Sequence, residues 1–249
     1  MESGACRATR VGRARSSAPC RRSIRRCCRY GATGRSEPLA QYFNVHPTHP
    51  QPRLIRRAAE IVRGGGLIAY PTDSSYALGC HLGDAQAQQR LRRARGVDDK
   101  HHLTLMCRDL SEIAAYAIVD NVQFRMLRLA TPGSYTFILR ATKVVPRRLQ
   151  HPKRKTIGVR IPAHAVAQAL LAELSEPMLS STLILPGAKA PLSDAAEIRA
   201  ALEHALDLVV DCGPCGVEPT TVVDLTGDEP LVLRQGRGPL EIFGHVAAL

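Results

Sequence analysis

The sequence has no tryptophan, and aromatic residues make up only 4% of its 249 residues. No apolar run approaches the roughly 20 residues that a transmembrane helix needs, so we expect no membrane association. From residue 40 onward there is also no Gly-x-x-x-x-Gly-Lys-Ser/Thr loop, no Gly-x-Gly-x-x-Gly fingerprint and no His-Glu-x-x-His pair. A nucleotide site in this chain would therefore have to be built without the common phosphate-binding loops.

Acidic residues are scarce at the N-terminus. Residues 1–36 hold ten arginines, no lysine and one acid, Glu2, so they carry +9 of the net charge of +12. The +3 that remains is unremarkable, and any basic binding surface must rest on local clusters. Three interpretations of this segment stay open: a disordered basic arm that contacts nucleic acid, a transit peptide, or translated sequence upstream of the true start. We favour the third, and we place residues 1–39 outside a domain that covers residues 40–244.

The rest of the chain alternates between helix-like and strand-like segments without a long linker. Apolar periodicity and capping residues predict helices over 52–63, 84–95, 109–116, 121–130, about 166–174 and 194–206. Short apolar runs predict strands over 67–70, 103–107, 135–140, 156–161, 178–185, 208–210, 221–225 and 231–234. This interspersed order predicts one α/β domain with a mixed sheet.

A polar segment follows the apolar run 67–70. Pro71-Thr72-Asp73-Ser74-Ser75-Tyr76 offers hydroxyls and one carboxylate. Ligands of open α/β sheets bind beyond the carboxyl ends of strands, and hydroxyls bind polar ligands at a lower desolvation cost than charges. The alternative is a turn in which Thr72 and Asp73 only cap local backbone groups. Spacing alone supports both equally. Arg160 ends another apolar strand and resembles this position.

Basic residues form two groups that lie far apart in the sequence. If they converge on one face, they can bind phosphates. The alternative is solvated surface charge, the commoner state of lysine and arginine. The groups are Arg90, Arg92, Arg93, Arg95 and Lys100, and then Arg147, Arg148, Lys153, Arg154, Lys155 and Arg160.

Cys212-Gly-Pro-Cys215 matches the tetrapeptide of thiol–disulfide oxidoreductases. In those proteins the first cysteine lies at a helix N-terminus, which lowers its thiol pKa. Here Pro219 disfavours a helix that would begin at Cys212. A single pair without further ligands is also a poor zinc site. We therefore favour neither a redox nor a metal role, and the cysteines of the domain fit a reducing cytosol.

Five blocks resemble YrdC-like proteins in sequence and order, in particular the YciO branch. They are residues 70–79 (YPTDSSYALG), 105–110 (LMCRDL), 132–139 (PGSYTFIL), 155–162 (KTIGVRIP) and 219–225 (PTTVVDL). The resemblance extends from about residue 41 to residue 240 and omits the N-terminal segment. It implies a twisted mixed β-sheet flanked by helices, with a basic concave cavity.

The resemblance also implies an activity. Synthases of this family condense L-threonine, bicarbonate and ATP, with Mg²⁺ accompanying ATP, into threonylcarbamoyl-AMP and pyrophosphate. The product modifies the adenosine beside the anticodon of certain tRNAs, and the family is also described as binding double-stranded RNA. No bound metal or organic cofactor is implied. On the family pattern threonine would contact Ser74, Arg160, Ser180 and Thr220, and ATP would contact Arg95, Thr156, Thr182 and Arg234. Arg160 would hold the threonine carboxylate through its planar fork, and Arg234 would neutralise phosphate charge.

Three positions depart from the synthase pattern. A Lys-x-Arg motif ends here in Val97, a Ser-x-Asn motif ends in Ile184, and Met106 stands where the synthases carry a histidine. Each change replaces a polar contact by an apolar side chain. Loss of one electrostatic stabiliser commonly lowers the rate by about 10²–10³, although such effects need not add.

Three hypotheses stay open. The chain is a threonylcarbamoyl-AMP synthase or a relative acting on another small acid, or it is a non-catalytic module that binds nucleotide or double-stranded RNA. In the third hypothesis, the chain is an α/β protein whose basic clusters are only solvated surface charge. We rank nucleotide or RNA binding above robust synthase activity, and we expect a cytoplasmic protein.

Overall fold

The computed structural model describes residues 39–98, 101–243 and 247–248. The expectation about the arginine-rich N-terminal segment falls on residues 1–38, outside the described residues, as does the one about Lys100. Within the described residues, no helix is long and apolar enough to cross a membrane.

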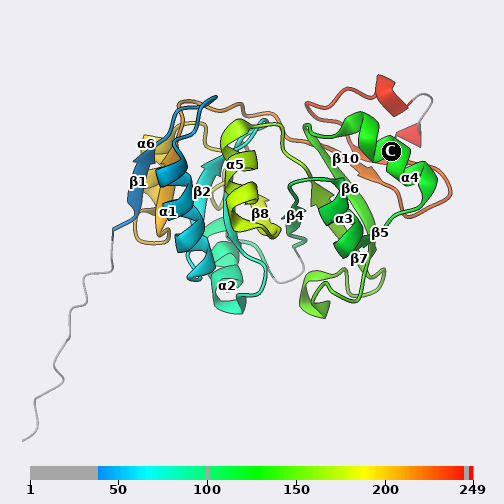
Figure 1. Cartoon of the computed structure of the whole chain (residues 1–249), viewed down its shortest axis with the longest axis horizontal. Helices are drawn as coiled ribbons and strands as arrows, with labels where there is room; N and C mark the ends of the chain where they lie inside the picture. The colour runs from blue at the N-terminus through cyan, green and yellow to red at the C-terminus, as the bar shows by residue number, and fades with distance from the viewer. Residues whose placement is uncertain (1–38, 99–100, 244–246, 249) are drawn as a thin grey trace, which may run out of the picture. The chain divides into compact units, whose positions relative to one another are not determined.

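One mixed sheet of twelve strands runs through the described part of the chain (Figure 1). Its order is β1-β9-β2-β3-β8-β4-β7-β6-β10-β11-β12, and β5 pairs with β6 beside this path. The strands are β1 (Gln41–Asn44), β2 (Ile68–Pro71), β3 (Tyr76–His81), β4 (Thr104–Met106), β5 (Ala117–Ile118), β6 (Tyr135–Ala141), β7 (Thr156–Arg160), β8 (Met178–Thr182), β9 (Leu208–Asp211), β10 (Thr221–Asp224), β11 (Leu231–Arg234) and β12 (Ala247–Ala248). The sheet contains both parallel pairs, such as β4–β7, and antiparallel pairs, such as β3–β8, which confirms the predicted mixed sheet.

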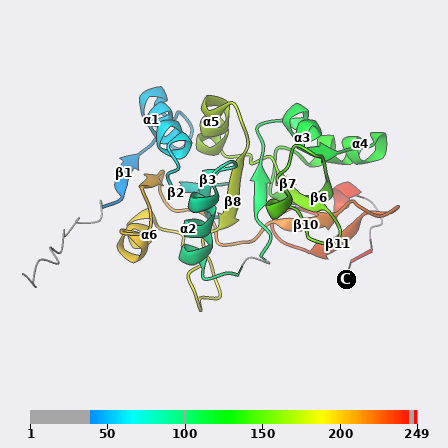
Figure 2. The same ribbon diagram turned by 90° about the horizontal axis from the view of Figure 1, so that it is seen from below.

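Six α-helices flank the sheet: α1 (Pro52–Arg63), α2 (Ala85–Arg95), α3 (Leu110–Tyr116), α4 (Asn121–Ala130), α5 (Ala165–Leu174) and α6 (Ala195–Leu202). Short 3₁₀ turns cover Arg147–Leu149 and Glu241–Phe243. Figure 2 shows α1 and α5 on one side of the strands and α2 and α6 on the other. Buried side chains of α1 and α5 form one core, and those of α2, α3, α4 and α6 belong to a second.

Local sequence sets the start of most helices. The carboxylate of Asp84 accepts hydrogen bonds from the backbone N–H groups of Gln86 and Ala87 and so caps α2, as predicted. Asp109, Asp120 and Asp194 cap α3, α4 and α6 in the same way. Each such cap contributes about 1 kcal/mol, because it satisfies amide groups that have no partner inside the helix.

Side-chain alternation explains why the central strands read as continuous apolar runs. Ile68 and Tyr70 pack into the α1–α5 core, whereas Leu67 and Ala69 pack into the other core. Successive side chains of a strand point to opposite faces, so a strand covered on both faces is apolar throughout.

Two predicted elements differ from the structure, and one central strand was not predicted. The strand predicted over 178–185 ends at Thr182, because its partner β3 begins at Tyr76 and the chain then turns away. The helix predicted through Leu206 ends at Leu202, although Leu206 is buried. The sequence analysis also missed β3, whose Ala77 and Gly79 have a low strand propensity that the sheet context overrides.

Candidate functional site

A cavity of about 720 Å³ lies over the central strands of the sheet. Cross-strand pairing joins Ser180 to Thr104, Thr104 to Gly158, Gly158 to Ile138, and Ile138 to Asp224, and all five residues line the cavity. Because side chains alternate along each strand, this register places one row of every strand on the same face. The register of the strands therefore determines which side chains form the cavity floor.

The segment predicted as a polar turn is a hairpin loop between β2 and β3. The Thr72 hydroxyl donates to the carbonyl of Ser75 at 2.6 Å and accepts from the backbone N–H groups of Ser74 and Ser75. Thr72 thus caps the turn, as one of the two interpretations required. Thr72 and Ser75 also line the cavity, so the segment lies where the ligand-site interpretation requires it.

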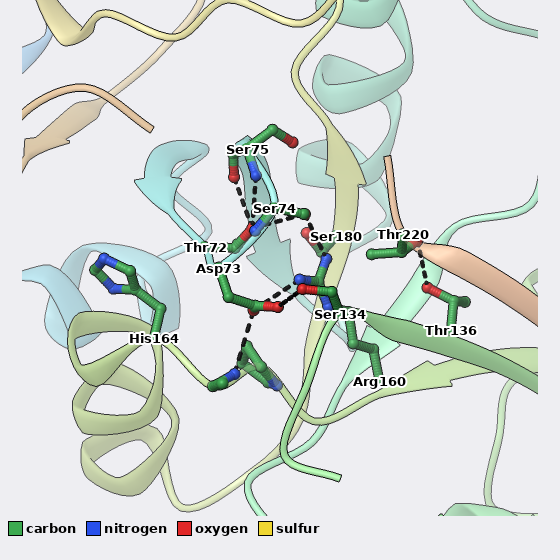
Figure 3. A network of polar contacts seen from close by, with 12 residues as sticks. Thr72, Asp73, Ser74, Ser75, Ser134, Thr136, Arg160, His164, Ser180 and Thr220 are labelled. Atoms are coloured by element: carbon green, nitrogen blue, oxygen red, sulfur yellow. Dashed lines mark hydrogen bonds and ion pairs between the residues drawn. The ribbon is translucent and has the colours of Figure 1, made fainter. Parts of the chain in front are cut away.

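Ser74 lies behind the cavity wall. Its side chain is buried, and its hydroxyl contacts the hydroxyl of Thr72 at 3.2 Å and Nη1 of Arg160 at 3.1 Å (Figure 3). Ser74 is not among the described residues that line the cavity. Ser74 therefore supports Arg160, whereas Thr72 and Ser75 are the residues of this segment that face the cavity.

Asp73 holds Arg160 in place, a role that the sequence analysis did not assign. Arg160 Nη2 donates to Asp73 Oδ1 at 2.7 Å, and the carboxylate also accepts from the backbone N–H of Ala163 at 3.2 Å and from the Ser134 hydroxyl. Burial raises the pKa of Asp73, but Arg160 and these donors outweigh burial and hold that pKa below its ordinary value. A carboxylate directly before the hydroxyls was the available signal.

Arg160 has less capacity for a ligand than its fork suggested. One N–H of each terminal nitrogen already donates to the protein, Nη1 to Ser74 and Nη2 to Asp73, so two of the five N–H donors of the guanidinium are used. Arg160 lines the cavity and is 6% exposed, and its buried Nε has no hydrogen-bond partner within the described residues. An unsatisfied buried donor costs about 1–3 kcal/mol, so this N–H is a candidate for contact with a ligand.

Two further predicted threonine-side residues line the cavity in fixed orientations. The Ser180 hydroxyl accepts from Tyr70 at 2.9 Å and donates to the carbonyl of Leu78 at 3.0 Å. The Thr220 hydroxyl lies 3.0 Å from that of Thr136. These partners leave lone pairs, which can accept hydrogen bonds from a ligand amine or hydroxyl.

Arg95 and Arg234 line the same cavity, and neither has an acidic partner among the described residues. Arg95 donates to the hydroxyl of Ser181 and, at 2.7 Å, to the carbonyl of Ile184. Arg234 donates to the carbonyl of Thr220 through Nε and Nη2, at 3.1 and 3.0 Å. Burial lowers the pKa of both side chains, and neither forms an ion pair with another described residue. Partly desolvated cations without a counter-charge are the electrostatic signature of an anion site.

Other cavity-lining groups respond to this positive field or add to it. Burial lowers the pKa of His101 and His102, and neighbouring basic side chains lower it further: Arg95 and Arg92 act on His101, and His151 and Arg92 act on His102. Arg154 and Lys189 also line the cavity. The only acid among the described lining residues, Asp224, has Arg154 at 3.6 Å. The predicted basic concave cavity is therefore present.

The two basic segments of the sequence do meet. His102 stacks on His151 with ring centroids 4.8 Å apart, and Arg148 donates to the side chain of Gln88 on α2 at 3.2 Å. Of the second segment, Arg154 and Arg160 line the cavity, whereas Arg147 and the lysines at 153 and 155 lie exposed outside its lining. The convergence predicted as one alternative is real, but only part of it faces the cavity.

The three positions that depart from the synthase pattern are not equivalent. Met106 and Ile184 line the cavity and make its wall more apolar. Val97, in contrast, lies outside the described lining residues, just after the left-handed Gly96 that ends α2. Thr156 and Thr182, predicted on the ATP side, both line the cavity, and their hydroxyls have no protein partner among the described residues. No group of three or more His, Cys, Asp or Glu residues within the described ranges could hold a metal ion.

Comparisons with known proteins place the chain in a family. The Sua5/YciO/YrdC family, described as telomere recombination, matches residues 60–236, and the chain belongs to this family. It is 55% identical over 205 residues to YciO of Escherichia coli K12, which covers 82% of this chain and 100% of that protein. The crystal structure of E. coli YciO matches over the same shares with a TM-score of 0.79.

Relatives with a named activity are more distant. The threonylcarbamoyl-AMP synthase of Halorhodospira halophila is 31% identical over 184 residues, which covers 73% of this chain and 95% of that enzyme. The structure of Pyrococcus abyssi Sua5 complexed with L-threonine matches with a TM-score of 0.77 at 27% identity, over 84% of this chain and 62% of that one.

Proposed function

We propose that the cavity binds ATP together with L-threonine, and that the chain forms threonylcarbamoyl-AMP more slowly than the synthases of its family. The observation that carries this proposal is a pair of cavity arginines, the partly buried Arg95 and the more exposed Arg234, neither of which has an acidic partner among the described residues. Binding of a polyphosphate would supply the counter-charge that both lack.

A small amino acid suits the hairpin end of the cavity. The Arg160 Nε–H is an unused donor for a carboxylate, and Thr72, Ser75 and Ser180 bring hydroxyls to the same wall. The threonine-bound Pyrococcus abyssi Sua5 supports this assignment by analogy. Because Arg160 is locked by Asp73, the donor is held in a fixed direction, which lowers the entropic cost of binding.

The chemistry requires cations where pyrophosphate leaves. The threonine amine takes up bicarbonate carbon with loss of water, and the resulting carbamate oxygen attacks the α-phosphorus of ATP and expels pyrophosphate. Arg95 and Arg234 would stabilise the charge that develops on that leaving group. Met106 and Ile184 offer no polar contact to it, which is why we propose a slow reaction.

The direct test is a calorimetric titration of the full chain with ATP and Mg²⁺, with and without threonine, followed by an assay of pyrophosphate release with bicarbonate. We expect millimolar or tighter ATP binding and slow release that depends on threonine. Binding without release would show a non-catalytic module. A folded chain that binds no ATP at millimolar concentration would refute the proposal.

A gain-of-function variant sharpens this test. Ile184→Asn returns an amide to the cavity wall without touching the backbone carbonyl that Arg95 uses. We expect pyrophosphate release to rise by about 10²-fold, the usual weight of one electrostatic contact in a transition state. Ile184→Val is the matched control, since it changes volume but adds no polar group. Equal rates for both variants would argue against the proposed reason for slow turnover.

Double-stranded RNA is a second candidate ligand, favoured by the convergence of the two basic segments at the stacked His102 and His151. Exposed Arg147, Arg148 and Arg154 could contact phosphates there. The test is a gel-shift titration of the full chain with duplex RNA at 50 and 200 mM salt. We expect binding that weakens about tenfold or more across this range. Salt-independent or absent binding would remove RNA from consideration.

A further inference from the structure

The Cys212–Cys215 loop, which joins β9 to β10, is held by contacts from outside it. Tyr76 donates its phenolic hydrogen to the carbonyl of Gly213 at 2.9 Å, and the backbone N–H of Cys212 lies 3.4 Å from the same phenolic oxygen. The backbone N–H of Cys215 donates to the carbonyl of Ser193 at 3.0 Å. Gly213 has a φ of 91°, a left-handed conformation that favours glycine and makes the tight turn between the cysteines feasible.

A histidine faces the first cysteine. Nε2 of His164 lies 3.7 Å from Sγ of Cys212. The other ring nitrogen, Nδ1, accepts from the backbone N–H of Val166 at 3.2 Å and caps α5. A nitrogen that accepts carries no proton, so the neutral ring is protonated at Nε2 and points that proton toward the Cys212 sulfur.

These surroundings favour a thiolate at Cys212. Hydrogen bonding with the Cys215 thiol is the largest cause of a shift that lowers the pKa of Cys212 to about 5, while burial opposes it and His164 and Tyr76 add to it. The same contact and burial raise the pKa of Cys215, and Asp211 raises it further. The two thiols are thus differentiated into a ready nucleophile and a protonated neighbour, without the helix N-terminus that other Cys-x-x-Cys sites use.

The other described cysteines lack these features. Cys80 and Cys107 are fully buried, and burial raises the pKa of both. Cys212 and Cys215 are only partly buried and can therefore be reached from solvent. Reactivity of cysteine follows thiolate character and access together, and among the described cysteines only Cys212 combines them, with the partly accessible Cys215 beside it.

The sequence favoured no redox role because no helix begins at Cys212, but His164 and Tyr76 supply contacts that the sequence does not show. We therefore propose that Cys212 and Cys215 form a thiol–disulfide exchange site that reacts with low-molecular-weight disulfides. The Cys212 thiolate attacks one sulfur of the oxidant, which breaks its S–S bond and releases one thiolate. Cys215 then attacks the Cys212 sulfur of the mixed disulfide and releases the second thiolate. The dithiol loses two electrons and the oxidant gains them. Because Cys212 reacts as a thiolate, one of the two protons on the released thiols comes from the Cys215 thiol and the other from solvent.

The site borders the hairpin of the cavity. Gly216 packs so closely against the carbonyl of Ser74 that an added Cβ would lie 2.8 Å from this oxygen. Tyr76, which holds the cysteine loop, is also the first residue of β3. The exchange site therefore shares its supports with the hairpin, although the proposal does not depend on any ligand of the cavity.

The first test exposes the full chain to oxidised glutathione and maps the peptides that carry residues 212–215 by mass spectrometry. We expect an internal disulfide, seen as the loss of two hydrogens. Cys215→Ser should instead retain glutathione on Cys212. In Cys212→Ser, glutathione should add to Cys215 at least about tenfold more slowly than it adds to Cys212 in Cys215→Ser. Absence of the internal disulfide, or equal rates for the two single variants, would overturn the proposal.

The second test asks whether His164 contributes. His164→Asn keeps an N-capping side chain for α5 and removes the ring that faces Cys212. Circular dichroism confirms the fold, and mass spectrometry follows alkylation of Cys212 by iodoacetamide at a fixed pH near 6. We expect the variant to react about threefold to tenfold more slowly. An unchanged rate in a folded variant would contradict the assigned role of His164.

Discussion

Two regions of the cavity use the same residue type in opposite ways. At the hairpin, Arg160 is bound by Asp73 and Ser74, and its charge is neutralised within the protein. Elsewhere in the cavity lining, Arg95 and Arg234 donate only to neutral oxygens among the described residues, so no described carboxylate neutralises their charge. An arginine that has an acid is part of the scaffold, whereas a cavity arginine without one is held ready for an anion.

Removal of Asp73 should produce the largest effect on stability, because it removes the ion pair that holds Arg160 at the hairpin. Asp73→Ala leaves a buried guanidinium without its carboxylate, since the Arg160 and Asp73 side chains are only 7% and 13% exposed. We expect the free energy of unfolding to fall by about 3–5 kcal/mol, measured by urea denaturation at neutral pH.

An exposed ion pair gives the matched control for that experiment. Arg57 and Glu60 form an ion pair at 3.0 Å, but their side chains are 57% and 49% exposed. Glu60→Ala should change stability by about 0.5 kcal/mol or less. If Asp73→Ala were as mild as this control, the hairpin region would not be held by its ion pair.

Removal of a cavity arginine should affect binding and spare stability. Arg234→Ala and Arg95→Ala each remove a charge-assisted contact to phosphate, worth about 1.5–3 kcal/mol, so ATP affinity should fall by about 10–100-fold in a calorimetric titration. The free energy of unfolding should change by less than about 1 kcal/mol. The variant loses the hydrogen bonds of the arginine, but it also loses the cost of partly desolvating its charge, and the two effects offset each other.

The control for the cavity arginines is Arg53→Ala on α1, which removes an exposed cation outside the cavity lining. It should leave ATP affinity unchanged within about twofold, because solvent and salt screen exposed charges. A loss of affinity equal to that of Arg234→Ala would mean that binding follows net charge and not the cavity.

The smallest predicted effect concerns the histidines of the cavity. Burial and neighbouring cations lower the pKa of His101 and His102, and a bound anion would raise it again. Binding therefore takes up protons, so sulfate affinity should rise about threefold to tenfold between pH 7.5 and pH 5.5. Sulfate keeps its charge over this range, and a fluorescence or calorimetric titration measures the change. A double His101→Gln and His102→Gln variant should lose the dependence.

The same pKa shifts predict how the stability of the fold depends on pH. The folded-state pKa of these histidines lies below the unfolded value, so the unfolded chain binds more protons as the pH falls through about 6.5. Stability without anions should therefore decrease on acidification through this window, and sulfate should offset part of the loss. Stability that rises on acidification through this window would contradict the positive field assigned to the cavity.

Sequence analysis predicted much of the fold because the relevant signals are local. The helix over 52–63, the Asp84 cap and the strand over 231–234 follow from periodicity and capping within a few residues. Two strands were missed. The four residues of β1 are too short a signal, although Tyr42 and Phe43 favour strands, and Ala77 and Gly79 of β3 have weak strand propensity. Pairing with neighbouring strands stabilises both.

The candidate site was predicted less completely, for a different reason. Arg95, Arg234 and Thr220 do line the cavity, but Ser74 lies behind its wall and Asp73 was assigned no role. From the sequence alone, every polar side chain of the turn is an equally good candidate for the site. The backbone conformation of the tight loop decides which of these side chains faces the cavity.

The sequence by itself determined the types of the elements, the capped helix starts and the residue blocks that mark the family. Only the tertiary structure decided which charges are paired, because Asp73 and Arg160 are separated by 87 positions and Cys212 and His164 by 48. Local free energies can be read from neighbouring residues, whereas burial and Coulomb interactions depend on distances that exist only once the sheet has folded.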